Sequence, residues 1–513
     1  MSRRDLFRTG LTVLIAAVAA ALATAAGAAP APPSSLAIVV RDQTVLRATP
    51  HATGQQLALL WQGEVVEVRG ERIDHVQVWD HARERGGYVD ASRLRRTTLA
   101  AAEAPELLAL VGFVRETPGS EALGIGLAAA YLKAATPDAL RGAGGAEAFD
   151  AIGTMADRLA LRASLGSGAP SGTAPGRAET ALIAHLEAVA RHGIAFRSFE
   201  RDGAMRICYD GDAFRRVLAN AAAEPRQRAR AALGLTRADC IDPALPVSER
   251  HSLDLWRADV LDRVDTAQLP AHWKSRVAMR RASVWSGLAF QRARRGDTPI
   301  ADDAARRAIA ELADVRRGEL ADDDLAGWHD AAIRVGASRW AAADAPAQLA
   351  KRNVRVATVP GEPGQTCVLL VDASKGDASA PLARRCTYGV VWTASAVVNR
   401  EGNALALAVQ PMEAWRELWL FTRQAQDGWS VQVLPPSAAA PEVGYAEFAG
   451  WVPGGRQVLV ARESRGAKGL KRNFEVVRLD TLGTERQAGD PTILGPFMRW
   501  QDAGWKRETV SLR

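Results

Sequence analysis

The chain has 513 residues, of which 48% are hydrophobic and 24% are charged, and its formal net charge at pH 7 is +7. This composition excludes a disordered or fibrous chain, and the length corresponds to about three globular domains. The positive charge is spread along the chain without a basic block, so the sequence predicts no nucleic-acid partner.

The first 28 residues have the three parts of an export signal peptide. A basic segment at residues 2–8 precedes an apolar run at residues 11–22, and Ala26 and Ala28 provide the small side chains that signal peptidase requires. The paired arginines of the basic segment suit either the Sec route or the twin-arginine route. The apolar run could also stay uncleaved as a short N-terminal membrane anchor. We expect a periplasmic or secreted protein with no membrane span after signal removal.

Residues 36–96 contain short runs rich in Val and Leu between glycine-containing turns, which is typical of a small β-barrel. The sequence Val-Leu-Arg-Ala-Thr-Pro begins at Val45, Gly63 precedes a β-branched strand, and Gly-Gly-Tyr-Val ends at Val89. With these motifs the region resembles the bacterial SH3 (SH3b) family. The resemblance implies a module that tethers a protein to the cell wall or to a partner and has no chemistry of its own.

Three aromatic residues of this module are candidates for a recognition groove: Trp61, Trp79 and Tyr88. Period-two alternation puts Val76 and Val78 on one face of their strand and Trp79 on the other. The family usually has a Trp before the valine of this strand, so its ligand-binding residues cannot be carried over directly. The alternative interpretation is that Trp61 and Tyr88 complete the core of the barrel.

Residues 97–344 are predicted to form a mainly α-helical bundle. Apolar side chains recur at i, i+3 and i+4, and prolines lie near the ends of the periodic segments. These segments are 106–115, 120–135, 178–191, 212–223, 248–264 and 272–294. Residues 166–176 are rich in Gly, Ser and Pro and predict a flexible loop, and a hairpin is expected around Gly203. Residues 285–308 resemble one tetratricopeptide unit, but without a second copy we expect only a packed helix pair.

Residues 353–513 are predicted to form an antiparallel β domain. The segment from Gly402 to Ala408 recurs 53 residues later, from Gly455 to Ala461, and each copy is followed by an apolar strand that contains Glu. With this order, residues 386–487 resemble TolB-type propeller repeats. The domain has room for about three such units, whereas a closed ring usually needs four blades. We therefore expect a propeller-like meander, and the sequence leaves its closure open.

The four cysteines are Cys208, Cys240, Cys367 and Cys386, and three pairings are possible. Local pairing of Cys208 with Cys240 and of Cys367 with Cys386 is favoured, because the two halves lie far apart in sequence and differ in structural class. A metal site is not indicated, since no cysteine has a Cys or His two to five residues away.

The sequence contains no recognisable catalytic motif. Asp239 and Cys240 lack the Ser-Gly that follows the nucleophile in exported cysteine peptidases, and a Gly-x-Ser-x-Gly elbow is absent. The eight histidines include no His-x-x-x-His pair, and there is no glycine-rich phosphate loop. We therefore assign no catalytic residue, metal or cofactor from the sequence.

The sequence predicts an exported, non-enzymatic cell-envelope protein. Its SH3-like module would tether it to a cell-wall component or an envelope protein, and its β domain would be an interaction surface. The alternative is a cell-wall hydrolase whose catalytic residues lie in the helical region. An isolated Glu with a raised pKa in a helical cleft would favour that alternative.

Overall fold

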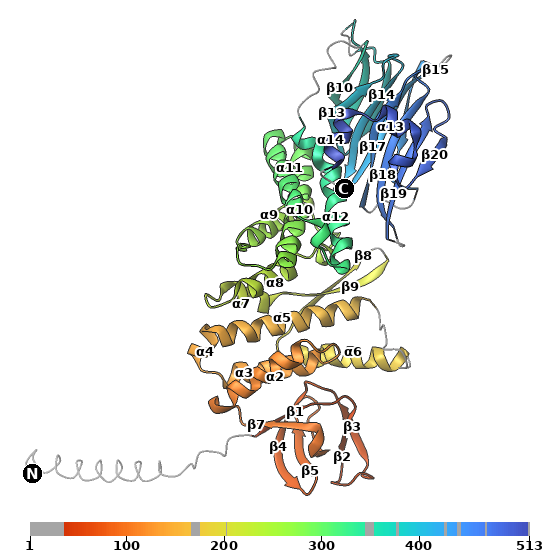
Figure 1. Ribbon diagram of the computed structural model, residues 1–513. Helices are drawn as coiled ribbons and strands as arrows, with labels where there is room; N and C mark the ends of the chain where they lie inside the picture. Colours follow the sequence, from red (N-terminus) through yellow and green to blue (C-terminus); the bar gives the residue numbers. More distant parts are fainter. Residues whose placement is uncertain are drawn as a thin grey trace, which may run out of the picture. The chain divides into compact units, whose positions relative to one another are not determined.

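The computed structural model describes residues 35–165, 175–201, 203–343, 353–375, 379–424, 428–438, 443–466 and 469–510. The predicted signal peptide and nearly all of the predicted loop at 166–176 lie outside these residues. Within them the chain is a mixed α+β protein, with an antiparallel sheet first, helices next and β-sheets last (Figure 1). It divides into two compact units, Met1–Ala223 and Glu224–Arg513, so the boundary falls within the helical part of the chain.

The first unit begins with a seven-stranded antiparallel sheet. Its strands are β1 (Leu36–Val39), β2 (Thr44–Arg47), β3 (Gln56–Leu60), β4 (Val65–Arg72), β5 (His75–Asp80), β6 (Arg85–Asp90) and β7 (Leu94–Thr97). They are hydrogen-bonded in the order β3-β2-β6-β5-β4-β1-β7. Because β3 and β7 end this order without pairing to each other, strand pairing does not close the sheet into the predicted barrel.

The core of this sheet is filled by apolar side chains at alternating strand positions. Its buried members are Ala37, Val39, Leu46, Leu60, Val66, Val76, Val78 and Val89. Val76 and Val78 are at most 1% exposed, as the alternation of β5 predicts. Trp79 follows Val78 on the opposite face of the strand.

Helices and one hairpin complete the first unit. They are α2 (Ala104–Arg115), α3 (Glu121–Ala134), α4 (Pro137–Arg141), α5 (Ala143–Ser164), α6 (Pro175–Ala190), β8 (Phe196–Arg201), β9 (Ala204–Tyr209) and α7 (Asp212–Ala219). The hairpin predicted around Gly203 is confirmed, and Gly203 has the positive φ of 74° that such a turn favours. Helix α5 is absent from the segments that periodicity predicted. Its glycines lower helix propensity, but Gly153 is needed, because a Cβ there would lie 2.4 Å from the Phe214 ring.

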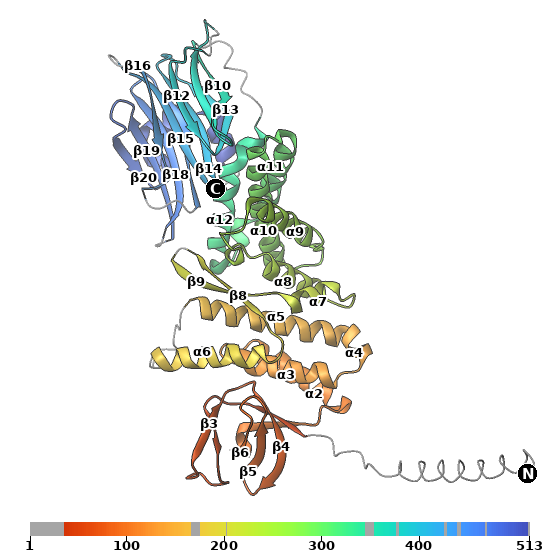
Figure 2. The ribbon, with the colours of Figure 1, turned by 180° about the vertical axis from the view of Figure 1, so that it is seen from behind.

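The second unit begins with a helical part. Its helices are α8 (Pro225–Leu235), α9 (Val247–Asp262), α10 (Ala271–Arg294), α11 (Thr298–Ala313), α12 (Asp322–Ser338) and the short 3₁₀ helix η5 (Arg339–Ala342). α10, α11 and α12 lie side by side in both views (Figure 1 and Figure 2). Their shared core includes Met279, Leu312 and Trp328. The predicted helix pair at 285–308 is part of α10 and α11, which pack on α12.

Two four-stranded antiparallel meanders follow. The first is β13 (Val390–Val398), β14 (Ala404–Met412), β15 (Trp415–Gln424) and β16 (Gly428–Leu434), and the second is β17 (Val443–Val452), β18 (Gln457–Gly466), β19 (Gly469–Arg478) and β20 (Thr484–Ala488). The first two strands of each meander begin 53 residues apart, which is the period of the predicted repeat. A short parallel pairing of β15 with β17, through Trp415↔Gly444 and Arg416↔Tyr445, joins the meanders into one eight-stranded sheet. The described residues show no closed propeller.

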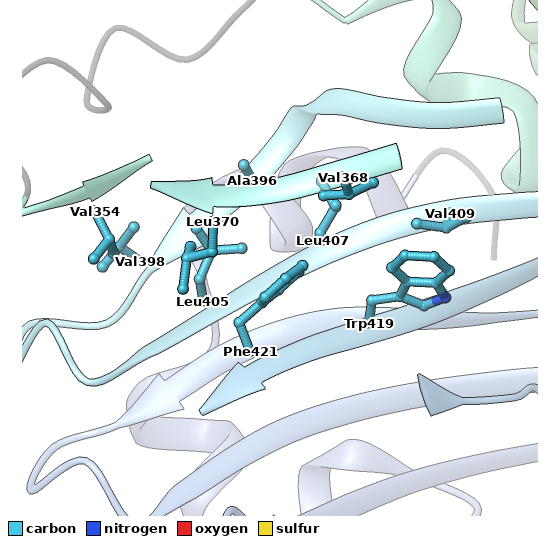
Figure 3. Close-up of a cluster of buried hydrophobic side chains, with 10 residues drawn as sticks. All are labelled: Val354, Val368, Leu370, Ala396, Val398, Leu405, Leu407, Val409, Trp419 and Phe421. Carbon is cyan, nitrogen blue, oxygen red and sulfur yellow. The ribbon is translucent and has the colours of Figure 1, made fainter. Parts of the chain in front are cut away.

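A separate three-stranded antiparallel sheet packs on the first meander. It consists of β10 (Val354–Pro360), β11 (Thr366–Asp372) and β12 (Ala383–Thr387). Figure 3 shows that Val354, Val368 and Leu370 of this sheet point toward side chains of β13, β14 and β15, among them Phe421 and Trp419. The apolar face of the first meander is therefore covered by earlier strands of the same unit.

Two C-terminal helices, α13 (Gly495–Trp500) and α14 (Ala503–Val510), were not expected in a β domain. Phe497 and Trp505 from these helices pack on Leu459 and Phe474 of the second meander. The backbone approaches closely here, since a Cβ on Gly450 would lie 2.2 Å from the carbonyl oxygen of Trp500. The helices thus cover apolar surface of the second meander.

The cysteines confirm the predicted disulfide chemistry. Cys367 of β11 and Cys386 of β12 are directly opposite in register and form a disulfide. Cys208 and Cys240 each belong to a disulfide as well, and no described cysteine is free. Disulfides of this kind are typical of an extracytoplasmic protein. Among the helices within the described ranges, none has the length and apolar character needed to cross a membrane.

Loss of the Cys367–Cys386 bond should weaken the second unit. The bond spans a sequence separation of 19 residues, and closing such a loop stabilises a fold by about 3 kcal/mol in the chain-entropy model. We expect the double variant Cys367→Ser/Cys386→Ser to lose that amount in chemical denaturation. Non-reducing peptide mapping of the wild-type protein should recover the linked peptides; two alkylatable thiols at these positions would contradict the prediction.

Candidate functional site

The predicted residues Trp79 and Tyr88 lie on one face of the N-terminal sheet. Trp79 of β5 is opposite Gly86 of β6, and Gln77 is opposite Tyr88. Trp79 and Tyr88 are therefore diagonal neighbours on adjacent strands, close enough for two aromatic side chains to form a common surface. A Cβ on Gly86 would lie 3.2 Å from the indole, so the Trp79 ring lies over this glycine.

Charged side chains surround the indole. The guanidinium of Arg69 lies 4.5 Å from the centroid of the Trp79 ring, in cation–π geometry. Glu67 accepts hydrogen bonds from Arg69 Nε (3.3 Å) and from His81 Nε2 (2.7 Å). These bonds hold the pKa of the Glu67 carboxyl below its ordinary value. We call Glu67, Arg69, Trp79, His81 and Tyr88 the Trp79 face.

Trp61, the third predicted residue, is in a different environment. It follows β3, is only 8% exposed, and meets the ring of His185 on α6 edge-to-face, with centroids 6.3 Å apart. Trp61 therefore packs the sheet against the helices, whereas Trp79 and Tyr88 are partly exposed. The sequence could not separate these roles, because the partner of Trp61 lies more than a hundred residues further along the chain.

The turn between β3 and β4, residues 61–64, attaches the sheet to the helices; we call it the docking turn. Gly63 has a φ of 85°, and a Cβ on it would lie 2.2 Å from the carbonyl oxygen of Ala122 on α3. Gln62 Nε2 donates to the carbonyl oxygen of Gly119 (2.9 Å), and His192 Nε2 donates to that of Gly63 (2.8 Å). The backbone of this turn is thus held between α3 and the end of α6.

A buried histidine strengthens the same contact. His185 Nε2 lies 2.8 Å from Asp42 Oδ1, while its Nδ1 is buried without a hydrogen-bond partner. Nε2 therefore carries a hydrogen and donates it to Asp42 Oδ1. Burial raises the pKa of Asp42, but the hydrogen bond and charge of His185 and the bonds from Gln62 outweigh it and hold that pKa below its ordinary value.

Buried charges close the other side of the docking turn. Arg83 Nη2 donates to Glu64 Oε1 (2.9 Å) and its Nη1 donates to Asp80 Oδ2 (2.7 Å), and both carboxylates are at most 5% exposed. Arg191 Nη1, just after α6, donates to the same Glu64 oxygen (3.2 Å). Hydrogen bonds to Glu64 are the main cause that raises the pKa of Arg83. The sheet is consequently fixed to the helices and is not a loosely linked module.

The β part of the second unit has an open groove of about 940 Å³ where the ends of the two meanders meet. Arg423, Arg456 and Arg478 line it together with Asp480 and Glu485. Arg478 Nε donates to Asp480 Oδ1 (2.9 Å), and this pairing lowers the pKa of the Asp480 carboxyl to about 2. The lining of the groove is therefore largely polar and charged.

The raised carboxyl pKa expected of a catalytic acid in the helical region occurs at Glu311. Burial raises the pKa of Glu311 on α11, although the charges of Arg281 and Arg307 lower it in part. Arg281 Nη1 is 3.8 Å from Glu311 Oε1, so this Glu is a member of a charged network and not an isolated acid. In the part of the chain that the structure describes, no group of three or more His, Cys, Asp or Glu side chains could hold a metal ion.

Substitution of Gly63 tests whether the docking turn fixes the sheet. Gly63→Ala should lower the free energy of unfolding by about 3 kcal/mol or more, because it adds a clash to the strain of a positive φ. Gly203→Ala is the matched control, since Gly203 has a φ of 74° and a Cβ on it would have no neighbouring atom within 4 Å. We expect it to cost about 1 kcal/mol. Equal losses for the two variants in urea denaturation would contradict the role of the docking turn.

The lowered pKa of Asp42 leads to a second prediction, about how the stability of the same contact depends on pH. A carboxyl whose pKa is lower in the folded state than in the unfolded state stabilises the fold at pH values above its unfolded-state pKa. This contribution is lost as the pH falls through the folded-state pKa. Asp42→Asn should therefore cost about 1 kcal/mol at pH 7 and progressively less below pH ~4. Denaturation curves at several pH values measure this difference; a cost that does not change with pH would show that the Asp42 charge is unimportant.

No protein-family model, curated protein or solved structure matches this chain. The likeness to bacterial SH3 domains and to TolB-type repeats therefore rests on the sequence motifs and the strand pattern alone.

Proposed function

We propose that this chain is an exported, non-enzymatic protein of the bacterial cell envelope that binds a cell-wall component or an envelope protein through the Trp79 face. The observation that supports it most is the pair of aromatic side chains, Trp79 and Tyr88, on the side of the sheet where neither packs into its core. The SH3-like motifs of residues 36–96 point to the same role.

The physical chemistry of the Trp79 face suits recognition. A large aromatic ring contributes much contact area for little loss of conformational entropy, and Trp, Tyr and Arg are the residues that most often dominate binding energy. Arg69 and Glu67 surround the ring with hydrogen-bonding groups that a polar wall ligand could use. The buried docking turn limits movement of the sheet, so little ordering would be needed on binding.

The export signal and the disulfides support an envelope location. A periplasmic or secreted protein meets an oxidising environment, in which disulfides persist. The open groove between the meanders would be a second contact surface, as expected for the β domain. The alternative of a cell-wall hydrolase gains no support from Glu311, which belongs to a charged network with Arg281 and Arg307 and with Asp262 and Asp314.

Replacing Trp79 tests the proposal directly. Trp79→Ala should weaken co-sedimentation of the mature protein with purified peptidoglycan by about 5- to 150-fold, the effect of losing one binding hot spot. The melting temperature should change little, because the side chain is on the outer face of the sheet.

Trp256→Ala is the matched control. Trp256 is 38% exposed on α9 and belongs to the second unit, whereas the Trp79 face belongs to the first. This variant should bind peptidoglycan like the wild type. Equal binding by both variants, or a large loss of stability in Trp79→Ala without a specific loss of binding, would refute the proposed role of Trp79.

A further inference from the structure

A small cavity of about 60 Å³ lies in the second unit, among η5, strands of both meanders and the start of α14. Its walls are partly aromatic, with Trp340, Phe448 and Trp505, and partly ionic, with Arg416 and Glu447. A cavity of this size has room for a few water molecules or one small organic ion. It is separate from both the Trp79 face and the open groove.

Arg416 is the most unusual residue of this cavity. It is 0% exposed, and it is on β15 at the place where that strand pairs with β17. Its Nη1 donates to the carbonyl oxygen of Gly336 (2.6 Å), its Nε has no partner, and its Nη2 is ion-paired with Glu447 Oε1 at 3.3 Å without the alignment of a hydrogen bond. Nε–H and one Nη2–H of a guanidinium point in parallel, which is the edge that binds both oxygens of a carboxylate.

Nearby carboxylates are already engaged. Glu447 Oε1 lies 3.3 Å from Arg416 Nη2, but it accepts hydrogen bonds from Nε (2.9 Å) and Nη2 of Arg339. Asp502 Oδ1 accepts from the backbone N–H groups of Gly504 (2.8 Å) and Trp505 (3.1 Å) at the start of α14. The cavity is lined by two arginines, Arg339 and Arg416, and two carboxylates, Glu447 and Asp502, so its formal net charge is zero. The site is distinguished by hydrogen-bond donors that make no hydrogen bond.

The indole N–H of Trp340 is a second buried donor that makes no hydrogen bond. Trp340 also lines the cavity. An indole N–H can only donate, as can a guanidinium. Burying three donor nitrogens that make no hydrogen bond is costly, and a ligand that only accepts hydrogen bonds would satisfy them.

We propose that this cavity binds a small carboxylate, of the size of formate or acetate, between the Nε–Nη2 edge of Arg416 and the indole N–H of Trp340. A carboxylate is planar, accepts hydrogen bonds at two oxygens and has no donor of its own, which matches a lining whose unsatisfied groups are donors. Water matches them less well, because each molecule also brings two hydrogens that need acceptors.

The pKa of Arg416 agrees with a positive charge that its neighbours compensate only in part. Burial lowers the pKa of Arg416 to about 10, although the charge of Glu447 raises it in part. A bound anion would favour the charged form of the guanidinium.

The test uses the mature chain and the salts themselves as probes. Isothermal titration and thermal denaturation with sodium formate or sodium acetate, against sodium chloride at the same ionic strength, should show saturable binding and a higher melting temperature only for the carboxylates. Trp340→Phe keeps the ring but removes the donor, and it should weaken carboxylate binding by about tenfold, the effect of one hydrogen bond to a charged group.

Trp451→Phe is the matched control, because the Trp451 indole nitrogen is also buried without a hydrogen-bond partner but does not line the cavity. It should bind formate like the wild type. Arg416→Lys keeps the charge without the two-pronged edge and should abolish binding; if this variant does not fold, the Trp340 and Trp451 variants decide. Equal effects of chloride and formate, or unchanged binding in Trp340→Phe, would overturn the proposal.

Discussion

The contact between Gly63 and the carbonyl oxygen of Ala122 determines how the N-terminal unit is built. Only a glycine allows the backbone to come this close while keeping a positive φ. With the turn in place, Gln62 and His192 can complete their hydrogen bonds to backbone carbonyl groups. The docked turn gives the sheet a rigid support, on which the Trp79 face is presented. A sheet that is fixed in this way differs from a module that moves on a flexible linker.

Ion pairs between helices and strands have the corresponding role in the second unit, and the pair of Arg339 with Glu447 is buried. Glu413, in the turn between β14 and β15, accepts from Arg250 of α9 (3.1 and 3.2 Å), and a Cβ on Gly287 of α10 would lie 2.9 Å from it. Arg339 of η5 is bonded to Glu447 of β17 in the same way. Because breaking a buried pair leaves an uncompensated charge, the helices and strands of this unit are expected to fold together. Arg416 stands out against this pattern, since two of its donors have no hydrogen-bond acceptor.

The internal repeat shows how a local pattern and a long-range arrangement differ. The 53-residue period predicts two equivalent antiparallel meanders, and β13–β16 and β17–β20 are those meanders. Their union in one sheet depends on two parallel residue pairs, at Trp415 and Arg416, and on helices α13 and α14 that cover the second copy. No periodicity in the sequence contains that information.

The sequence by itself determined the features that depend on neighbouring residues. These include the alternation that buries Val76 and Val78, the hairpin at Gly203, the repeat, and the pairing of Cys367 with Cys386 across adjacent strands. Such patterns are local, because strand periodicity and turn chemistry act over a few residues.

The tertiary structure alone decided the features that depend on distant residues. Trp61 is buried because His185 of α6 packs on it, and α5 tolerates its glycines because Phe214 needs the space at Gly153. Neither partner is close in sequence. Side chains and backbone from separate elements must occupy the same space before such roles are set, and packing at that range has no signature in a single sequence.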